Sequence, residues 1–236
     1  MILIFDYFET LLNSRSIDFN RGLKPFWESY YKDRCSFEEM KSYGEELFKV
    51  LLSKHATGEE YPFVEKELPL FADKFGGDKL TIDYREEADF LMLCNEFEKD
   101  PDMERFLAEC SSRNIPMYVL SNSGFRGGAL MEVLDRFAIG KHFKRLWSSA
   151  DYGRIKPCRD FFELAVETAL NENPSESRED IFFIGDIYET DVIGAKNAGI
   201  RSAWLNKKGE ADPEGLADLN ITSTKLLAEL IADRMI

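Results

Sequence analysis

Histidine, cysteine and basic residues are scarce in this sequence, and each shortage excludes a class of function. The two histidines and the four cysteines (Cys35, Cys94, Cys110, Cys158) show no ligand-like spacing, so no zinc site is expected and the thiols should be reduced. Lys and Arg number 30 against 44 Asp and Glu, which gives a net charge of −14. That charge argues against binding to nucleic acid or to anionic membranes, because both require basic surfaces.

Long apolar runs are also missing. No run approaches the roughly 18 apolar residues that a membrane-spanning helix needs, so no membrane span is predicted. The opening run MILIF is too short for a signal peptide and has no basic region before it. We therefore expect a cytoplasmic protein. The 236 residues, 44% of them apolar, suffice for one large domain or for one domain carrying an insertion.

Short apolar runs alternate with amphipathic stretches, and the runs end on polar residues. MILIF ends at Asp6, PMYVL at Ser121, IFFIG at Asp186 and SAWL at Asn206, while the weaker run FKRLW leads into Ser148. Strands that alternate with helices predict an α/β fold with a Rossmann-like parallel sheet covered by helices on both faces. Because such sheets bind ligands at the carboxyl ends of their strands, these polar residues should be neighbours in space.

Residues 15–95 break the alternation and predict helices without strands. SFEEMKSYGEELFKVLL opens with a capping box of Ser36 and Glu39, and PFVEKELPLFADKFG and YREEADFLMLCNEFEKD are also typical of helices. We interpret 15–95 as an all-helical cap domain that stands over the carboxyl edge of the sheet, with 1–14 and 96–236 forming the core domain. Periodicity alone also allows these helices simply to cover one face of the sheet.

The polar residues after the predicted strands form a candidate site for transfer of an anion. Asp6, Asp186 and Asp191 contribute three negative charges, of which Lys156 in GRIKP offsets one. A dianionic phosphate would need a further cation, and Mg²⁺ prefers carboxylate and carbonyl oxygens. One carboxylate could attack phosphorus while the Ser121 hydroxyl and the Lys156 ammonium hold the other oxygens. Taken singly, each residue has an ordinary structural explanation, so the prediction depends on the joint arrangement.

The order of these segments resembles the haloacid dehalogenase-like (HAD) hydrolase superfamily over nearly the whole chain. FDYFETL is similar to the family's first motif, VLSNS to the second, GRIKPCRDFF to the third and FIGDIYETDVIGAKNAG to the fourth. The resemblance implies a HAD fold with a helical cap that closes over the substrate and excludes water. It also implies hydrolysis of a small phosphorylated metabolite through an aspartyl-phosphate intermediate.

The resemblance assigns a role to each matching residue of the first and fourth motifs. Asp6 would be the nucleophile. Asp6, Asp186 and the backbone carbonyl of Phe8 would bind Mg²⁺. Asp191 would orient the lysine of the third motif and a metal-bound water.

The second and third motifs would hold the phosphate group. Ser121 would bind phosphate with Asn122 alongside, and Lys156 would steady both the nucleophile and the transferred group. These implied roles complete a predicted set of catalytic, substrate-binding and metal-binding residues.

Phe8 departs from the pattern of the family's phosphatases. They place an Asp there, which protonates the leaving group and activates water, and phenylalanine cannot transfer a proton. The loss of a general acid and base commonly lowers the rate by about 10²–10⁴-fold. Glu9 follows directly, but alternation along a strand points it away. The two histidines, His55 and His142, stand in no recognisable motif, and we expect loop or surface positions for them.

Two alternative functions stay open. An aromatic residue at position 8 also resembles the 2-haloacid dehalogenases, whose Asp displaces halide from carbon without a metal. Those enzymes place Ser, Asn and Trp where this chain has Asp186, Tyr188 and Thr190, which favours phosphate-ester hydrolysis here. The second alternative is a HAD fold kept as a binding module with little turnover. The sequence predicts neither the identity of the substrate nor the oligomeric state.

Overall fold

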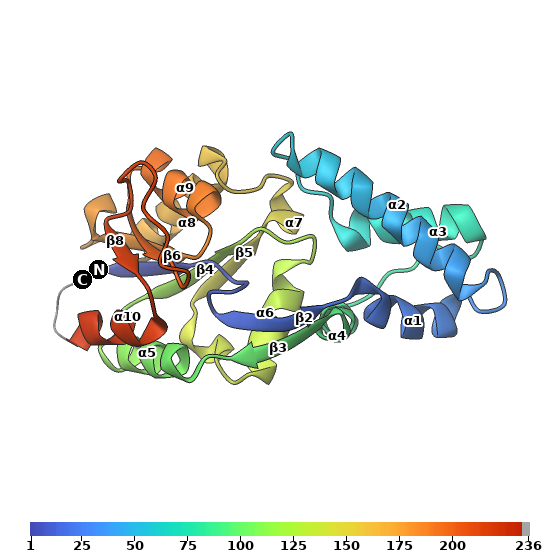
Figure 1. Ribbon diagram of the computed structural model, residues 1–236, viewed down its shortest axis with the longest axis horizontal. Helices are drawn as coiled ribbons and strands as arrows, with labels where there is room; N and C mark the ends of the chain where they lie inside the picture. The colour runs from blue at the N-terminus through green and yellow to red at the C-terminus, as the bar shows by residue number, and fades with distance from the viewer. Residues whose placement is uncertain (233–236) are drawn as a thin grey trace.

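A six-stranded parallel sheet forms the centre of the computed structural model, which describes residues 1–232 (Figure 1). Across the sheet the strands are ordered β5 (Arg145–Ser148), β4 (Met117–Ser121), β1 (Ile2–Phe5), β6 (Ile181–Gly185), β7 (Arg201–Leu205) and β8 (Leu219–Ile221). All adjacent pairs are parallel. The predicted α/β fold is confirmed, and its order places the carboxyl ends of β4, β1 and β6 side by side.

Helices cover both faces of this sheet. Leu3 and Phe5 of β1 face α5 (Pro101–Ser112), α6 (Gly127–Arg136) and α10 (Thr224–Ala232). Ile2 and Ile4 face the opposite side, where they pack against α8 (Arg159–Glu172) and α9 (Ile193–Asn197). All four residues of β1 are buried, which explains why the strand is a continuous apolar run rather than an alternating one.

Shorter segments complete the core. They are the helix α7 (Ser149–Tyr152), the 3-10 turns η2 (Gly140–His142) and η3 (Arg178–Asp180), and the π-helix η4 (Tyr188–Val192). Among the described residues, no helix combines the length and the apolar character that crossing a bilayer requires.

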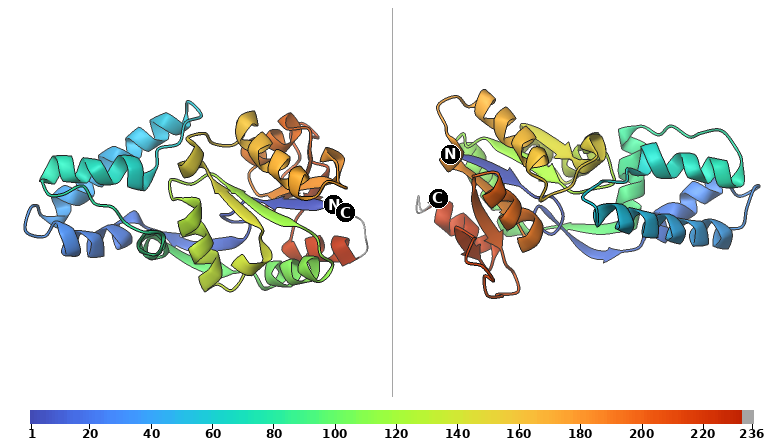
Figure 2. Two further views of the ribbon diagram at one scale, coloured as in Figure 1. Left: turned by 180° about the vertical axis from the view of Figure 1, so that it is seen from behind. Right: turned by 90° about the horizontal axis from the view of Figure 1, so that it is seen from above.

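The helical insertion extends beyond one end of the sheet (Figures 1 and 2). It contains α1 (Phe19–Tyr30), α2 (Phe37–His55), the π-helix η1 (Phe63–Glu67), α3 (Leu68–Phe75) and α4 (Tyr84–Cys94). Ser36 and Glu39 make the predicted capping box at the start of α2. The insertion has an apolar core of its own, in which Phe63 and Phe90 stack with their ring centroids 4.6 Å apart.

The prediction of helices alone over 15–95, running on through NEFEK, is wrong. The helix α4 ends at Cys94, and the chain continues as β3 (Asn95–Lys99), which pairs antiparallel with β2 (Leu12–Ile17). Glu and Lys favour helices when the local sequence decides. Here a partner strand far away in the sequence supplies the hydrogen bonds instead. This two-stranded ribbon carries both connections between core and insertion.

A buried ion pair joins the insertion to the core. Glu87 of α4 is fully buried and accepts hydrogen bonds from Arg126 Nε at 2.6 Å and from the Arg126 backbone amide at 2.7 Å. The Arg126 guanidinium also donates to the Ile82 carbonyl at 2.7 Å. Burial raises the pKa of Glu87 despite this partner. The start of α6 is thereby fixed against the insertion.

We expect Glu87→Ala to lower the free energy of unfolding by about 3 kcal/mol or more, because it leaves the Arg126 charge without its buried partner. The matched control is Glu132→Ala, which breaks a surface pair with Arg136 and should cost at most about 0.5 kcal/mol. Urea denaturation followed by circular dichroism measures both. Equal losses in the two variants would contradict a structural role for the buried pair.

Candidate active site

Three charged side chains meet at the carboxyl ends of β1 and β6. Lys156 Nζ lies 2.5 Å from Asp6 Oδ1 and 2.7 Å from Asp191 Oδ1. All three side chains are almost completely buried. Asp6 directly follows β1, Asp191 belongs to η4 after β6, and Lys156 lies in the loop before α8. The topology therefore brings together residues from three distant parts of the sequence.

Asp191 reaches this position because the chain turns closely against the end of β6. A Cβ atom at Gly185 would lie 2.3 Å from Asp191 Oδ2, so a side chain there would displace the carboxylate. The Ile187 amide donates to the same oxygen at 3.0 Å. The π-helical turn of η4 matches the frequent occurrence of such turns at functional sites. Gly185 was not singled out from the sequence, although a glycine directly before Asp186 was visible there.

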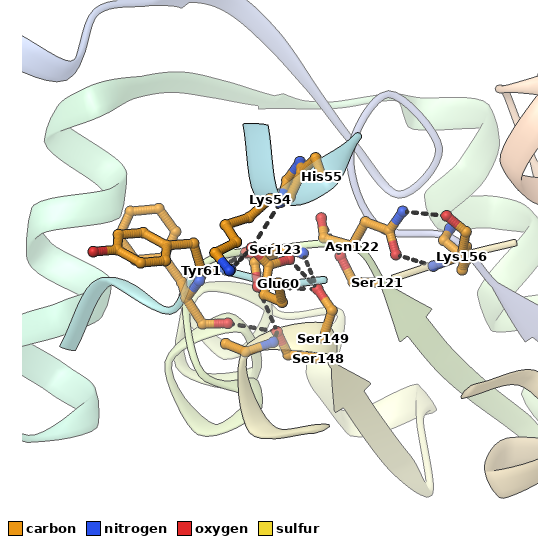
Figure 3. A network of polar contacts seen from close by, with 12 residues as sticks. Lys54, His55, Glu60, Tyr61, Ser121, Asn122, Ser123, Ser148, Ser149 and Lys156 are labelled. Atoms are coloured by element: carbon orange, nitrogen blue, oxygen red, sulfur yellow. Dashed lines mark hydrogen bonds and ion pairs between the residues drawn. The ribbon is translucent and has the colours of Figure 1, made fainter. Parts of the chain in front are cut away.

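Asn122 positions the lysine. Its side-chain Oδ1 accepts a hydrogen bond from the Lys156 amide at 2.7 Å, and its Nδ2 donates to the Lys156 carbonyl at 3.2 Å. Figure 3 shows this reciprocal pair. The buried Ser121 hydroxyl makes a long 3.4 Å contact with the Asn122 carbonyl. Of these two residues, Ser121 thus keeps more hydrogen-bonding capacity for a substrate.

Asp186 lies beside the charged trio and is only partly exposed. Oxygen atoms of Asp6, Asp186 and Asp191 lie within 4.8 Å of one another. Asp186 Oδ1 is buried and finds no hydrogen-bond partner within the described part of the chain. Trp204 Nε1 donates to the Asp186 carbonyl at 3.0 Å, which fixes the backbone there. No motif in the sequence indicated this contact of the tryptophan.

The carboxylates are crowded enough to change their acidity. Burial raises the pKa of Asp6 to about 6, with Lys156 opposing and Asp191 reinforcing that rise. Burial raises the pKa of Asp186 to about 7, reinforced by Asp6 and Asp191. Burial alone would lower the pKa of Lys156, but the two carboxylates raise it, so the ammonium stays charged.

This donor set fits a divalent cation. One ammonium faces three carboxylates, and one of their buried oxygens has no partner among the residues described. Hard oxygen donors and an excess of negative charge are what Mg²⁺ prefers.

A family model for haloacid dehalogenase-like hydrolases matches residues 1–199. The chain belongs to this family. It is therefore a HAD hydrolase, and the resemblance of its four motifs is confirmed at the level of the family and the fold.

Similar proteins include phosphatases and a dehalogenase. The pyrimidine 5'-nucleotidase YjjG of Escherichia coli is 36% identical over 105 residues, or 44% of each chain. The phosphoserine phosphatase of Thermus thermophilus is 30% identical over 122 residues, or 51% of this chain and 46% of that protein. The chain thus matches less than half the length of these curated relatives. The 2-haloacid dehalogenase of Pseudomonas syringae shares the fold, with a TM-score of 0.68 at 20% identity over 99% of this chain and 100% of that chain.

The ring of Phe8 in this HAD hydrolase packs against other aromatic rings. The ring packs on Tyr7 and on Phe97 of β3, with centroid distances of 4.8 and 6.1 Å. Glu9 adopts a positive φ of 56°, and its Oε1 accepts a hydrogen bond from the Ser14 amide at 2.8 Å. Its carboxylate is therefore bonded to the ribbon, and Glu9 also lines the cavity that Phe8 and Asn122 line. The positive φ shows a turn at Glu9 rather than the strand alternation expected there.

The side chain of Tyr188 bonds and packs with residues outside the cluster of Asp6, Asp186 and Asp191. Its hydroxyl donates to Asp212 Oδ1 at 2.6 Å, and its ring packs on Trp204 at 5.0 Å. The position that is Asn in the dehalogenases thus serves the packing of the core in this HAD hydrolase.

Two cavities lie between the site and the insertion. The first, of about 320 Å³, is lined by Phe8, Asn122 and Ser123 of the core and by His55 of α2. The second, of about 680 Å³, is largely apolar and runs along α2, and Phe48, Leu51, Leu52, Tyr61 and Phe63 are among its lining residues. Both cavities touch Ile17, Phe19, Gly124 and Phe125. They therefore adjoin one another and reach from the loop after β1 to the insertion.

Glu67 faces the apolar cavity with a carboxylate that is mostly buried. Burial, reinforced by the charge of Glu60, raises its pKa from 4.5 to about 7. The unfolded chain then ionises at lower pH than the folded protein does. Stability from this residue is therefore complete at low pH and is lost as the pH rises from about 4.5 to about 7.

We expect Glu67→Gln to remove this pH dependence. Relative to the unsubstituted protein, the variant should gain stability between pH 5 and pH 8 by an amount of up to about 3 kcal/mol. Urea titrations of both proteins across this range measure the difference, and carboxylates common to both cancel. A difference that stays constant with pH would show that Glu67 is not the titrating group.

Proposed function

We propose that this HAD hydrolase is a Mg²⁺-dependent phosphatase of small phosphorylated metabolites that works in the cytoplasm through an aspartyl-phosphate at Asp6. The observation that carries the proposal is the buried Asp6–Lys156–Asp191 chain beside Asp186, whose Oδ1 lacks a partner among the described residues. The nucleotidase and phosphatase named above support the choice of phosphate esters.

The reaction divides into two displacements at phosphorus. A carboxylate oxygen of Asp6 attacks phosphorus, the bond to the leaving oxygen breaks, and that oxygen takes up a proton. Water then attacks the aspartyl-phosphate, releasing inorganic phosphate and the free carboxylate. Lys156 holds the nucleophile and stabilises charge on the transferred oxygens, Ser121 donates to one of them, and Asp191 keeps the ammonium in place.

Mg²⁺ would be held by Asp6, Asp186 and the Phe8 carbonyl. Its charge would let a dianionic phosphate enter a cluster that one lysine leaves negative. The protein's own part is to keep the two aspartates close together at the ends of β1 and β6.

The helical insertion, 15–95, serves in this proposal as a cap domain over the core of 1–14 and 96–236. The adjoining cavities support that arrangement, because they begin at the nucleophile's loop and end against α2. The smaller cavity would take the ester oxygen and the apolar one the organic part of the substrate. Pockets of this size and character are typical of small-molecule sites.

We expect the protein to hydrolyse 4-nitrophenyl phosphate with Mg²⁺ and Asp6→Asn to lose at least about 10³-fold in kcat, because the amide cannot act as the nucleophile. Nitrophenolate release measures the rate, and thermal melting checks the fold. Chloride release from 2-chloropropionate without metal, with no phosphatase activity, would instead identify a dehalogenase. Inactivity on both would favour a binding module.

Metal binding has a readout independent of turnover. Because Mg²⁺ relieves repulsion in the folded cluster, it should raise the melting temperature, and Asp186→Asn should abolish most of that rise. Glu189→Gln, which removes the same charge from an exposed neighbour, is the matched control and should keep the rise. An unchanged Mg²⁺ response in Asp186→Asn would exclude this residue as a ligand.

A further inference from the structure

The imidazole of His55 lines the same cavity as Phe8, the residue that stands where the family's phosphatases have their proton-transferring Asp. Phe8 and His55 line the same space of about 320 Å³, together with Asn122 and Ser123 from the loop after β4. His55 is the last residue of α2, and its side chain is about one-third exposed. Of the two histidines in the chain, it is the one that reaches this cavity.

A buried carboxylate holds the imidazole. His55 Nε2 lies 2.8 Å from Glu60 Oε1, which also accepts the Tyr61 amide at 2.8 Å. The other oxygen of Glu60 accepts the Ser149 hydroxyl at 2.5 Å. Figure 3 shows Glu60 between His55 of the insertion and Ser149 of the core. The ring is thus oriented through its Nε2 atom, and within residues 1–232 its Nδ1 atom has no hydrogen-bond partner.

The same network reaches the loop after β4, which the proposed function assigns to phosphate binding. The Ser123 amide donates to Ser149 Oγ at 2.8 Å, and the Phe63 amide donates to the Gly124 carbonyl at 2.8 Å. The Glu60 amide donates to the Gly153 carbonyl at 3.1 Å. The imidazole is therefore positioned relative to the residues directly after Ser121 and Asn122, and not only relative to its own helix.

The Glu60 carboxylate that holds this ring is ionised. Burial alone would raise the pKa of Glu60, but hydrogen bonds from His55, Ser149 and the Tyr61 amide lower it, so the carboxylate is ionised. A carboxylate bound to one ring nitrogen orients the other nitrogen for proton transfer. Other charged groups near this pair include the surface pair Lys54–Glu59, Glu9 in the lining of the same cavity, and Glu67, whose pKa the charge of Glu60 raises.

We propose that His55 is the general acid and base of the phosphatase, in the place that Phe8 leaves empty. The inference rests on the proposed function. Nδ1–H of the imidazolium gives its proton to the leaving oxygen as Asp6 bonds to phosphorus and the ester P–O bond breaks. The neutral Nδ1 then takes a proton from the water that displaces phosphate from Asp6. Each turnover consumes one water and returns His55 to its protonated form.

The test compares two esters of similar shape in His55→Asn: 4-nitrophenyl phosphate, whose phenolate leaves unprotonated, and 4-methoxyphenyl phosphate, whose phenolate needs a proton. With Mg²⁺, kcat/KM should fall about 10²-fold for the methoxy ester and less than about tenfold for the nitro ester. His142→Asn, whose ring contacts Ser111 on the core, should leave both values unchanged. Added imidazole should restore the methoxy ester's hydrolysis.

Equal losses on the two esters, no loss, or no rescue by imidazole would overturn the assignment of His55. Glu60→Gln serves as a second variant in case His55→Asn misfolds, and it should show the same selectivity between esters in weaker form. If the unsubstituted protein hydrolyses neither ester with Mg²⁺, the proposed phosphatase function itself fails. Melting curves and circular dichroism establish that each variant is folded.

Discussion

Lys156 between Asp6 and Asp191 is the contact on which the rest of the site depends. Burying each of these charges costs several kcal/mol of hydration, and only close pairing compensates for it. The fold supplies that pairing from two adjacent strand ends and from the loop that Asn122 holds at Lys156. Because one ammonium cannot neutralise three carboxylates, the same pairing leaves excess negative charge at Asp186, where a hard cation fits.

The parts of this arrangement that the sequence could predict are those with a local signal. Buried parallel strands are continuous apolar runs, so their ends were visible as the polar residues Asp6, Ser121 and Asp186, and parallel topology brings such ends together. The strand at 95–99 had no such signal, because its residues favour helix and its partner lies some eighty positions earlier. The boundaries of the insertion could not be placed from the sequence for the same reason, because the ribbon of β2 and β3 connects the insertion to the core and belongs to both.

Other features of the site depend on tertiary contacts that the sequence pattern does not predict. The two hydrogen bonds of Asn122 to Lys156 join segments over thirty residues apart, and the sequence predicted only that Asn122 lies near phosphate. The contact between Trp204 and the Asp186 carbonyl is another such case. His55 had no motif around it. Its place in the cavity follows from Glu60 and Ser149, and only the docked insertion brings these two together.

The position of the proton carrier has a consequence for catalysis. In a site with an acidic side chain at position 8, nucleophile and acid share one loop of the core and are always together. Here the proposed nucleophile belongs to the core and the proposed acid to the insertion, so proton transfer on this proposal requires the insertion to be seated on the loop after β4. Phe8 contributes to that seating, because its ring packs on Phe97 of the ribbon through which the insertion is attached.

On this proposal, the phenylalanine at position 8 replaces an acid that is fixed in the core. The acid that takes over, His55, acts only when the insertion is docked on the core.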